Sequence, residues 1–297
     1  MIAILLALLQ AGQESDHLHL EAVPIPAPVC KHWSFVGMDR SGTVFAQVSA
    51  EPTVFVIEGV RQGHPVAAAI PLEDGRSLNS IERLNTGRLI ATLTVGGVLS
   101  QDEQGRLALR KDLGLLRGGS LHRADGDDWW LVEHNTINHL DGDLQQKVVV
   151  PADVIRDGIM FAVAGTLGEL LIRDGSGSVH VISADASALT TFRLAPRFAS
   201  SLGLAQIKGV SLVLAQDGLL GLGRTTWERS IASMLDRPIW RPLVDGEDTL
   251  YLAEARGGRI FRCTLTLPVE GPPEPTMQVD TEPVPLSGVL AFIAQSK

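Results

Sequence analysis

The chain has 297 residues, of which 45% are hydrophobic, so it is long enough and apolar enough to fold around a large core. A formal net charge of −9 excludes a generally basic surface of the kind that binds nucleic acid or anionic membranes. The two cysteines, Cys30 and Cys263, form no CxxC pair, which excludes a disulfide framework and a zinc module.

The chain begins with an apolar run, residues 1–9, that has some features of a signal peptide. No Lys or Arg precedes the run, and no small-residue cleavage site follows it. It is too short to span a bilayer, as is the apolar run at 286–294. We therefore favour a cytoplasmic protein. The alternative is a periplasmic or secreted protein in which residues 1–12 act as a signal peptide, removed within 1–16.

A glycine turn followed by a short apolar strand recurs along the chain, and residues 85–92 (NTGRLIAT) are its clearest copy. The glycines that lead the copies are Gly42, Gly87, Gly126, Gly168, Gly209, Gly246 and Gly288. Their spacing of about 41 residues is typical of a repeat architecture.

Each unit predicts four strands. One precedes the glycine, as at 81–84, and the apolar one follows it. A polar or Gly-rich turn then leads to a third strand, as at 179–182, and a more polar fourth, as at 189–193. Four antiparallel strands in about 40 residues are typical of one blade of a β-propeller. Over nearly its whole length the chain resembles the broad propeller class, including NHL-like, YVTN-like and gluconolactonase-like propellers.

The number of blades depends on the two ends. Six complete hairpins run from Trp33 to Thr264, and a Pro-rich linker at 268–275 follows. Residues 282–286 and 289–293 then predict two strands, and residues 2–9 and 17–23 predict two more. We therefore predict a single domain over 1–297 with seven blades, the seventh built by both termini. The alternative is a six-bladed ring after a cleaved signal peptide, which would put the blades of Cys30 and Cys263 side by side, within reach of a disulfide.

The loops that lead from one unit to the next share a cation. In a propeller these loops lie on the same face as the turns between second and third strands and form a mouth of the central channel. The cations are Lys31, Arg76, Arg117, Arg156, Arg197 and Arg237. They predict an electropositive mouth that binds an anionic small molecule or an acidic segment of a partner protein, because guanidinium groups grip such groups bidentately. The alternative is that each cation only fixes its own loop.

Acidic residues at or near the second-strand ends suggest a different site. They are Glu133, Asp174, Asp217 and Glu254. The resemblance to gluconolactonase-like propellers implies a divalent metal such as calcium, held by oxygen ligands at the channel mouth, and a metal-dependent hydrolase or lactonase. No catalytic motif occurs, so we favour a non-catalytic binding scaffold without a cofactor, a membrane span or a nucleic-acid partner.

Overall fold

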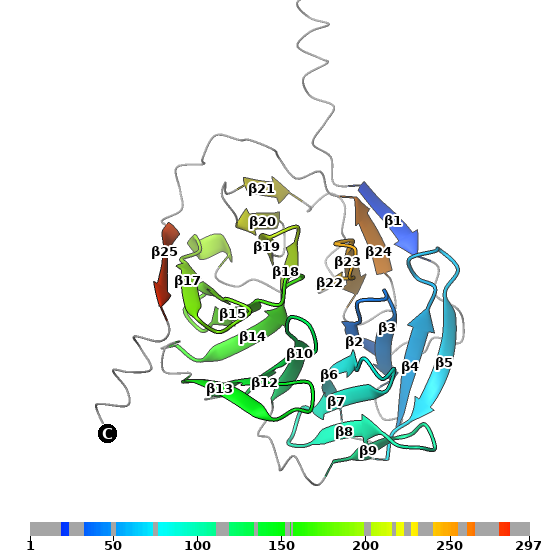
Figure 1. Ribbon diagram of the computed structural model, residues 1–297. Coiled ribbons are helices and arrows are strands. Elements are labelled where there is room, and N and C mark those ends of the chain that lie inside the picture. The colour runs from blue at the N-terminus through cyan, green and yellow to red at the C-terminus, as the bar shows by residue number, and fades with distance from the viewer. Residues whose placement is uncertain are drawn as a thin grey trace, which may run out of the picture.

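A computed structural model describes the following residues: 19–23, 33–48, 52–73, 77–110, 119–133, 136–151, 155, 157–198, 203–215, 218–222, 227–230, 240–254, 260–264 and 279–285. Within them, six antiparallel sheets surround a common centre, each sheet forming one blade (Figure 1). The chain is therefore an all-β propeller of six blades. In the described part of the chain, no helix is long and apolar enough to cross a membrane.

Each blade runs outward from the centre in chain order. The first blade comprises β2 (Trp33–Met38), β3 (Val44–Val48), β4 (Thr53–Glu58) and β5 (Val66–Pro71). The second comprises β6 (Leu78–Arg83), β7 (Leu89–Leu93), β8 (Val98–Gln101) and β9 (Leu107–Leu109). The third comprises β10 (Ser120–Arg123), β11 (Trp129–Val132), β12 (Thr136–Leu140) and β13 (Gln146–Pro151).

The other three blades follow the same plan. The fourth comprises β14 (Ile159–Ala164), β15 (Leu170–Asp174), β16 (Val179–Ile182) and β17 (Ala188–Phe192). After the short 3-10 helix η3 (Pro196–Phe198), the fifth comprises β18 (Gly203–Ile207), β19 (Val210–Leu214), β20 (Gly218–Leu222) and β21 (Trp227–Ser230). The sixth begins with β22 (Trp240–Val244), β23 (Leu250–Glu254) and β24 (Ile260–Thr264).

The two terminal strands do not build a seventh blade, so that prediction is wrong and the six-blade count of the alternative is right, while its cleaved signal peptide stays a prediction. The first described strand, β1 (His19–Val23), pairs antiparallel with β24 and is the fourth strand of the sixth blade. The last, β25 (Val279–Pro285), adds a fifth strand to the outer edge of the fourth blade, beside β17. The strands predicted at 2–9 and 289–293, the linker at 268–275 and Cys30 lie outside the described residues. Cys263 is a buried free thiol.

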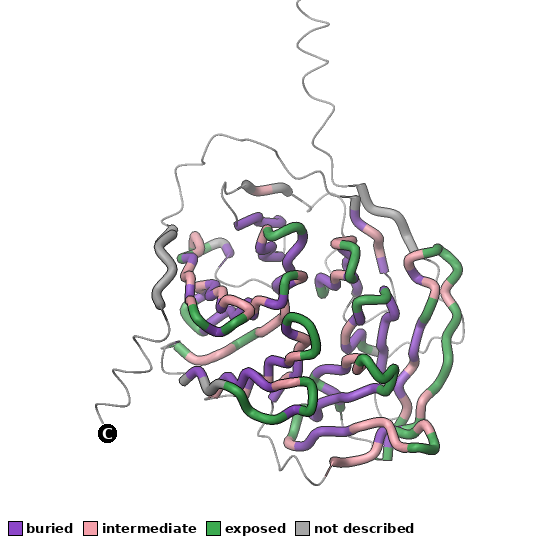
Figure 2. Tube along the Cα trace, viewed as in Figure 1, coloured by how far each residue is buried: buried purple, intermediate pink, exposed green. Residues whose placement is uncertain are grey.

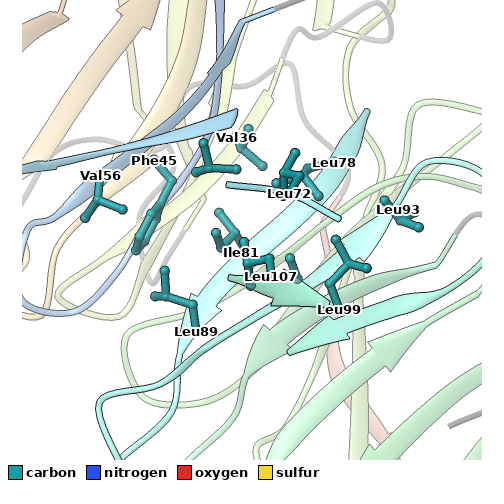
Figure 3. Packing of buried hydrophobic residues seen from close by; sticks show 12 residues of the cluster. Val36, Phe45, Val56, Leu72, Leu78, Ile81, Leu89, Leu93, Leu99 and Leu107 are labelled. Carbon is teal, nitrogen blue, oxygen red and sulfur yellow. The ribbon is translucent and has the colours of Figure 1, made fainter. Parts of the chain in front are cut away.

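The hydrophobic core is divided among the gaps between blades. Six clusters of buried side chains each draw residues from two neighbouring blades, and together they close the ring. Figure 3 shows the cluster between the first and second blades, where Phe45 and Val56 of one face Ile81 and Leu89 of the other. The second strands β3 and β7 are mostly buried, whereas β5 at the rim is mostly exposed (Figure 2). Because a blade buries its faces only against its neighbours, the units are stable as a ring.

Steric constraints explain the glycine that leads the fourth repeat. Gly168 has a φ of +89°, and a Cβ there would lie 2.4 Å from the backbone nitrogen of Asp125 in the preceding blade. The same close approach lets the indole Nε1 of Trp130 donate a hydrogen bond of 2.8 Å to the carbonyl oxygen of Gly168. The glycine therefore permits both the tight turn and the contact between blades.

Candidate functional site

The inner strands β2, β6, β10, β14, β18 and β22 surround a central channel with a cavity of about 1230 Å³. The channel has two ends. The turns between the first and second strand of each blade surround one, which we call the turn end. The connections between blades and the turns between second and third strands surround the other, which we call the crossover end, and this is the mouth that the sequence singled out.

A polar network surrounds the turn end. Asp39, in the turn after β2, accepts hydrogen bonds through Oδ1 from the backbone N–H groups of Ser41 (2.9 Å) and Thr43 (3.0 Å). Its Oδ2 forms an ion pair of 2.8 Å with Nε of Arg83, at the end of β6 in the next blade. The Asp39 carboxylate thus fixes its own turn and ties the first blade to the second.

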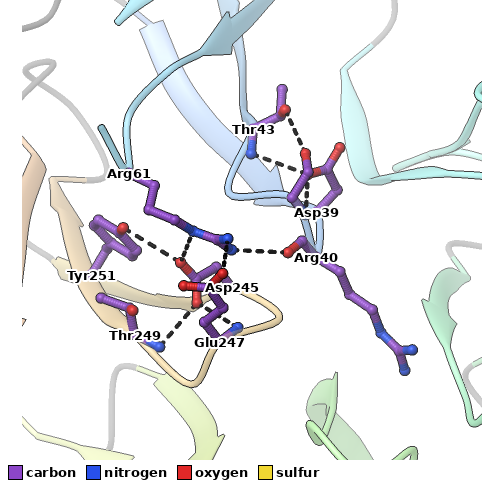
Figure 4. Close-up of polar contacts among 9 residues, drawn as sticks. Asp39, Arg40, Thr43, Arg61, Asp245, Glu247, Thr249 and Tyr251 are labelled. Atoms are coloured by element: carbon purple, nitrogen blue, oxygen red, sulfur yellow. Dashed lines mark hydrogen bonds and ion pairs between the residues drawn. The ribbon is translucent and has the colours of Figure 1, made fainter. Parts of the chain in front are cut away.

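An equivalent aspartate joins the sixth blade to the first (Figure 4). Oδ1 of Asp245 accepts hydrogen bonds from the backbone N–H groups of Glu247 and Thr249. Its Oδ2 lies 3.0 Å from Nε of Arg61, and the Asp245 side chain is fully buried. Arg61 also contacts Glu247 at 2.6 Å and donates to the carbonyl oxygen of Arg40 at 3.1 Å. This network closes the ring on the turn side.

Two titratable side chains at the same level of β6 and β10 line the channel: Glu82 and His122. Burial, with the Asp39 charge second, raises the pKa of Glu82 to about 8, although the Arg123 and Arg40 charges act in the opposite direction. Burial lowers the pKa of His122 to about 4. His122 Nε2 lies 2.7 Å from Oγ of Ser120. At pH 7 both groups are therefore mostly neutral.

One arginine enters the channel at the crossover end. Arg241, at the start of β22, donates hydrogen bonds from Nη1 to the carbonyl oxygens of Phe35 (2.7 Å) and Val36 (3.2 Å). Burial lowers its pKa from the ordinary value. Among the described residues, no carboxylate forms an ion pair with Arg241.

The wall formed by β14 is apolar. Its burial pattern is unusually open for an inner strand, with 59% of Met160 and 41% of Phe161 exposed. Pairing with β15 shifts register between Ile159 and Phe161, so Met160 is the extra residue of a β-bulge. A bulge interrupts the alternation of side chains, which lets both Met160 and Phe161 reach the cavity. The Arg173 guanidinium lies 5.6 Å from the centre of the Phe161 ring.

The side chains of the predicted crossing-loop cations lie outside the described structure. Lys31, Arg76, Arg117, Arg156 and Arg237 lie outside the described residues. Arg197 lies in η3, whose backbone is described but whose Arg197 side chain is not. Their role at the crossover end stays a prediction.

Of the four predicted acidic residues, the side chains of Glu133 and Asp174 are described. Glu133 lines the cavity, and its Oε2 accepts a hydrogen bond of 2.9 Å from Oγ1 of Thr136. Asp174 does not line it. Asp217 and the side chain of Glu254 lie outside the described part of the chain. Among the described residues, no three His, Cys, Asp or Glu side chains gather so that they could hold a metal ion.

Asp174 belongs to a buried network within the fourth blade. Its Oδ2 lies 2.9 Å from Nε2 of His180, whose Nδ1 lies 3.0 Å from Oγ1 of Thr191. Burial acts to raise the pKa of Asp174, but hydrogen bonds from His180, Ser176 and the Ser178 backbone outweigh it, so the pKa is lowered. In this structure the carboxylate fixes its turn and three strands.

The sequence analysis missed the arginines that the structure places in the channel: Arg40, Arg123 and Arg241. One signal was available for Arg123, because Arg83 and Arg123 are 40 residues apart, at the same position of successive repeats. Arg40 and Arg241 share no such spacing.

Comparisons with known proteins agree with this architecture. No protein-family model matches the chain, and no curated protein matches it by sequence. A catalytically inactive virginiamycin B lyase from Staphylococcus aureus, solved with quinupristin, is 11% identical with a TM-score of 0.61, covering 84% of this chain and 100% of that one. A gluconolactonase from Xanthomonas campestris is 11% identical with a TM-score of 0.52, covering 88% and 93%. YCF48 bound to D1 peptide is 13% identical with a TM-score of 0.55, covering 85% and 98%.

These similarities and the six radial sheets place the chain in the broad β-propeller class. At such low identity the likeness concerns the fold alone, because propellers of one shape carry unrelated functions.

Proposed function

We propose that the protein is a non-catalytic propeller that binds an anionic small molecule, or an acidic segment of a partner protein, in its central channel. The observation that supports this proposal is the position of Arg241 in the channel. Its guanidinium lies in the channel wall and is held by main-chain carbonyl oxygens. Those contacts orient the group without neutralising it, so its positive charge is available to a ligand.

The chemistry of guanidinium favours an oxyanion. Arg241 uses Nη1 for Phe35 and Val36, and its other N–H groups have no described partner. A carboxylate or phosphate can accept two parallel hydrogen bonds from such a fork. If the predicted crossing-loop cations also face this end, they add to its positive field and raise the association rate.

The apolar wall suggests that the ligand has an apolar part as well. Met160 and Phe161 are the exposed large side chains of β14 and line the same cavity as Arg241. Covering apolar surface stabilises a complex by about 25 cal/mol per Å² removed from water. In a ligand with an anionic group and an apolar body, the anionic group can bind Arg241 while the apolar body packs against Met160 and Phe161. The peptide in the YCF48 structure provides a precedent for partner binding by a similar fold.

Isothermal titration calorimetry can test the proposal with citrate and with an acidic peptide that carries one phenylalanine. We expect Arg241→Ala to weaken binding at least tenfold. The matched control is Arg106→Ala, because Arg106 is exposed and, among the described residues, forms its ion pair with Asp102 within the β8–β9 turn. Equal affinity of the Arg241→Ala protein and the unchanged protein would overturn the proposal.

A metal-dependent hydrolase is the second candidate, and it rests on Glu133 in the cavity lining. The gluconolactonase neighbour shows that this fold can carry lactone chemistry. Hydrolysis of glucono-1,5-lactone with calcium, and again with a chelator, separates the two candidates. Calcium-dependent turnover that Glu133→Gln abolishes would favour the enzyme, whereas no turnover above the Glu133→Gln variant favours the binding scaffold.

A further inference from the structure

Three charged or titratable side chains from three blades meet at the turn end of the channel: Arg40, Glu82 and Arg123. All three line the cavity. In the described structure no ion pair joins Glu82 to either arginine, although the charges of both act on its pKa. The three groups are therefore near neighbours without being in contact.

The strand register explains why Glu82 and Arg123 face each other. Cross-strand partners lie on one face of a sheet. Glu82 pairs with Ile90, and Arg123 pairs with Trp129. Ile90 and Trp129 pack together in the core between the second and third blades. Glu82 and Arg123 consequently project from the two facing sides of the same gap.

Arg40 reaches this gap from the first blade. Its Nη2 donates a hydrogen bond of 3.0 Å to the carbonyl oxygen of Ala124 in the third blade, so the side chain passes across the end of the second. Its own carbonyl oxygen is held by Arg61 at 3.1 Å, and Figure 4 shows its side chain directed away from that network. Burial, and then the Arg123 charge, lower the pKa of Arg40.

Several contacts hold the Arg123 guanidinium in place, while its Nε–H group makes no hydrogen bond in the described structure. Its Nη1 donates to the carbonyl oxygen of Arg83 at 3.2 Å, and its Nη2 donates to Asn85 and to the carbonyl oxygen of Gly126. The guanidinium lies 5.8 Å from the centre of the Trp129 ring. Its Nε is buried and has no hydrogen-bond partner in the described structure. Because Nε is closed to solvent, Arg123 acts on a ligand in the channel through its positive charge.

The carboxylates near the two guanidinium groups balance their charges only in part. The charge of Asp125 acts on Arg40, but Asp125 is exposed and its Oδ1 accepts a hydrogen bond from the Gly126 backbone N–H group. Asp39 is already fully used by its turn and by Arg83. Asp127 lies 3.8 Å from Arg123 on the exposed side and is itself exposed. Burial keeps the Glu82 carboxyl largely protonated at pH 7, since its pKa is about 8, so it can donate a hydrogen bond.

We propose that Arg40, Glu82 and Arg123 form a second binding site, at the turn end, for the oxyanion group of a small molecule, either a carboxylate or a phosphate-like tetrahedral anion. Two cations and one O–H donor converge on it, and the ligand supplies only acceptor oxygens. This site is separate from Arg241 at the crossover end and does not depend on the function proposed above.

Isothermal titration calorimetry at pH 7 with sulfate, and separately with benzoate, tests the site. Comparing the two anions shows whether the site prefers a tetrahedral anion or a carboxylate. Neither anion titrates between pH 7 and 9. We expect Arg40→Ala to weaken binding of the preferred anion at least tenfold, and Arg106→Ala to leave this binding event unchanged. Arg123→Gln removes the positive charge, and we expect about a tenfold loss. Equal affinity in Arg40→Ala and the unchanged protein, or no binding of either anion, would overturn the inference.

The role of Glu82 gives a separate pH test. The charged and titratable groups around it are Asp39 and Arg40 of the first blade, Arg83 of its own strand, His122 and Arg123 of β10, and Asp125 after β10. His122, with a pKa of about 4, stays neutral from pH 7 to 9. Ionisation of Glu82 removes its donor and adds a negative charge, so anion affinity should fall severalfold as pH rises through 8. The Glu82→Gln protein should still bind the anion at pH 7, and its anion affinity should not fall as pH rises through 8. An unchanged pH profile in Glu82→Gln would contradict the role given to Glu82.

Discussion

The inner strands of the second and third blades differ sharply from the inner strand of the fourth, although all three occupy the same place in the repeat. At the second-to-last position of each strand stand Glu82 in β6, His122 in β10 and Val163 in β14. Their cross-strand partners Ile90, Trp130 and Leu171 are all fully buried and hydrophobic. The partners in the second strands hold the blades together, so the channel-facing residue is free to change. One ring can therefore carry a polar wall and an apolar wall side by side.

Removing a polar link between the second and third blades should have the largest effect. Ser80 Oγ accepts a hydrogen bond of 2.9 Å from the Leu121 backbone N–H and lies 2.8 Å from Oγ1 of Thr92. Ser80→Ala leaves a buried N–H without an acceptor, so we expect a loss of about 2 kcal/mol in the free energy of unfolding. Denaturant unfolding measures it, with the exposed Thr94→Ala as control. Losses of equal size in the two variants would show that the polar wall adds no stability.

The charge state of Glu82 should make stability depend on pH. Its pKa is about 8 in the folded protein and near 4.5 when unfolded, so the folded state binds more protons between these values. Stability should therefore fall as pH rises from 4.5 to 8. Glu82→Gln should be more stable than the unchanged protein at pH 9, by roughly 1–2 kcal/mol after allowance for solvent in the channel. Thermal unfolding across this range checks it, and parallel curves would contradict it.

His122 should act with the opposite sign. Its pKa is about 4 in the folded protein against 6.5 when unfolded, so the unfolded state binds more protons between these values. Stability should fall as pH drops from 6.5 to 4. In the His122→Gln protein this part of the fall in the free energy of unfolding should be absent, a difference of about 1 kcal/mol at pH 4. Comparing unfolding midpoints at pH 7 and pH 4 measures the difference, and an unaltered acid dependence would contradict the burial of His122.

The apolar wall should tolerate change best. Phe161 is 41% exposed and has a guanidinium contact from Arg173. Phe161→Ser should cost only about 0.5 kcal/mol, chiefly the cation–π contact. The same variant should weaken binding of the phenylalanine-bearing acidic peptide more than binding of citrate. Calorimetry on both probes checks this, and an equal loss for both would mean that the wall contributes no apolar contact.

The repeat itself could be predicted from sequence, because the leading glycine of five of the six blades, such as Gly87 and Gly168, occupies a turn with positive φ. The blade count could not. A strand pattern shows how many strands the termini supply, but it does not show which free edge each strand joins. β1 pairs with β24, and β25 pairs with β17, which is already the fourth strand of its blade.

The channel residues were harder to foresee for a different reason. Arg40 belongs to a turn of the first blade, yet its partner is Ala124 in the third. Glu82 looks like an ordinary charged residue in a short strand. These residues form a site because three blades bring them together at one end of the channel. No local sequence pattern predicts that three distant segments lie side by side there.

The pairing of β1 with β24 has a consequence for how the protein is made. The N-terminal strand leaves the ribosome first, but its partner at Ile260–Thr264 is synthesised more than two hundred residues later. The nascent chain must keep this strand unpaired while five blades are completed. The pairing can therefore form only late in synthesis, and we expect a chain truncated before β24 to remain an open, protease-sensitive arc.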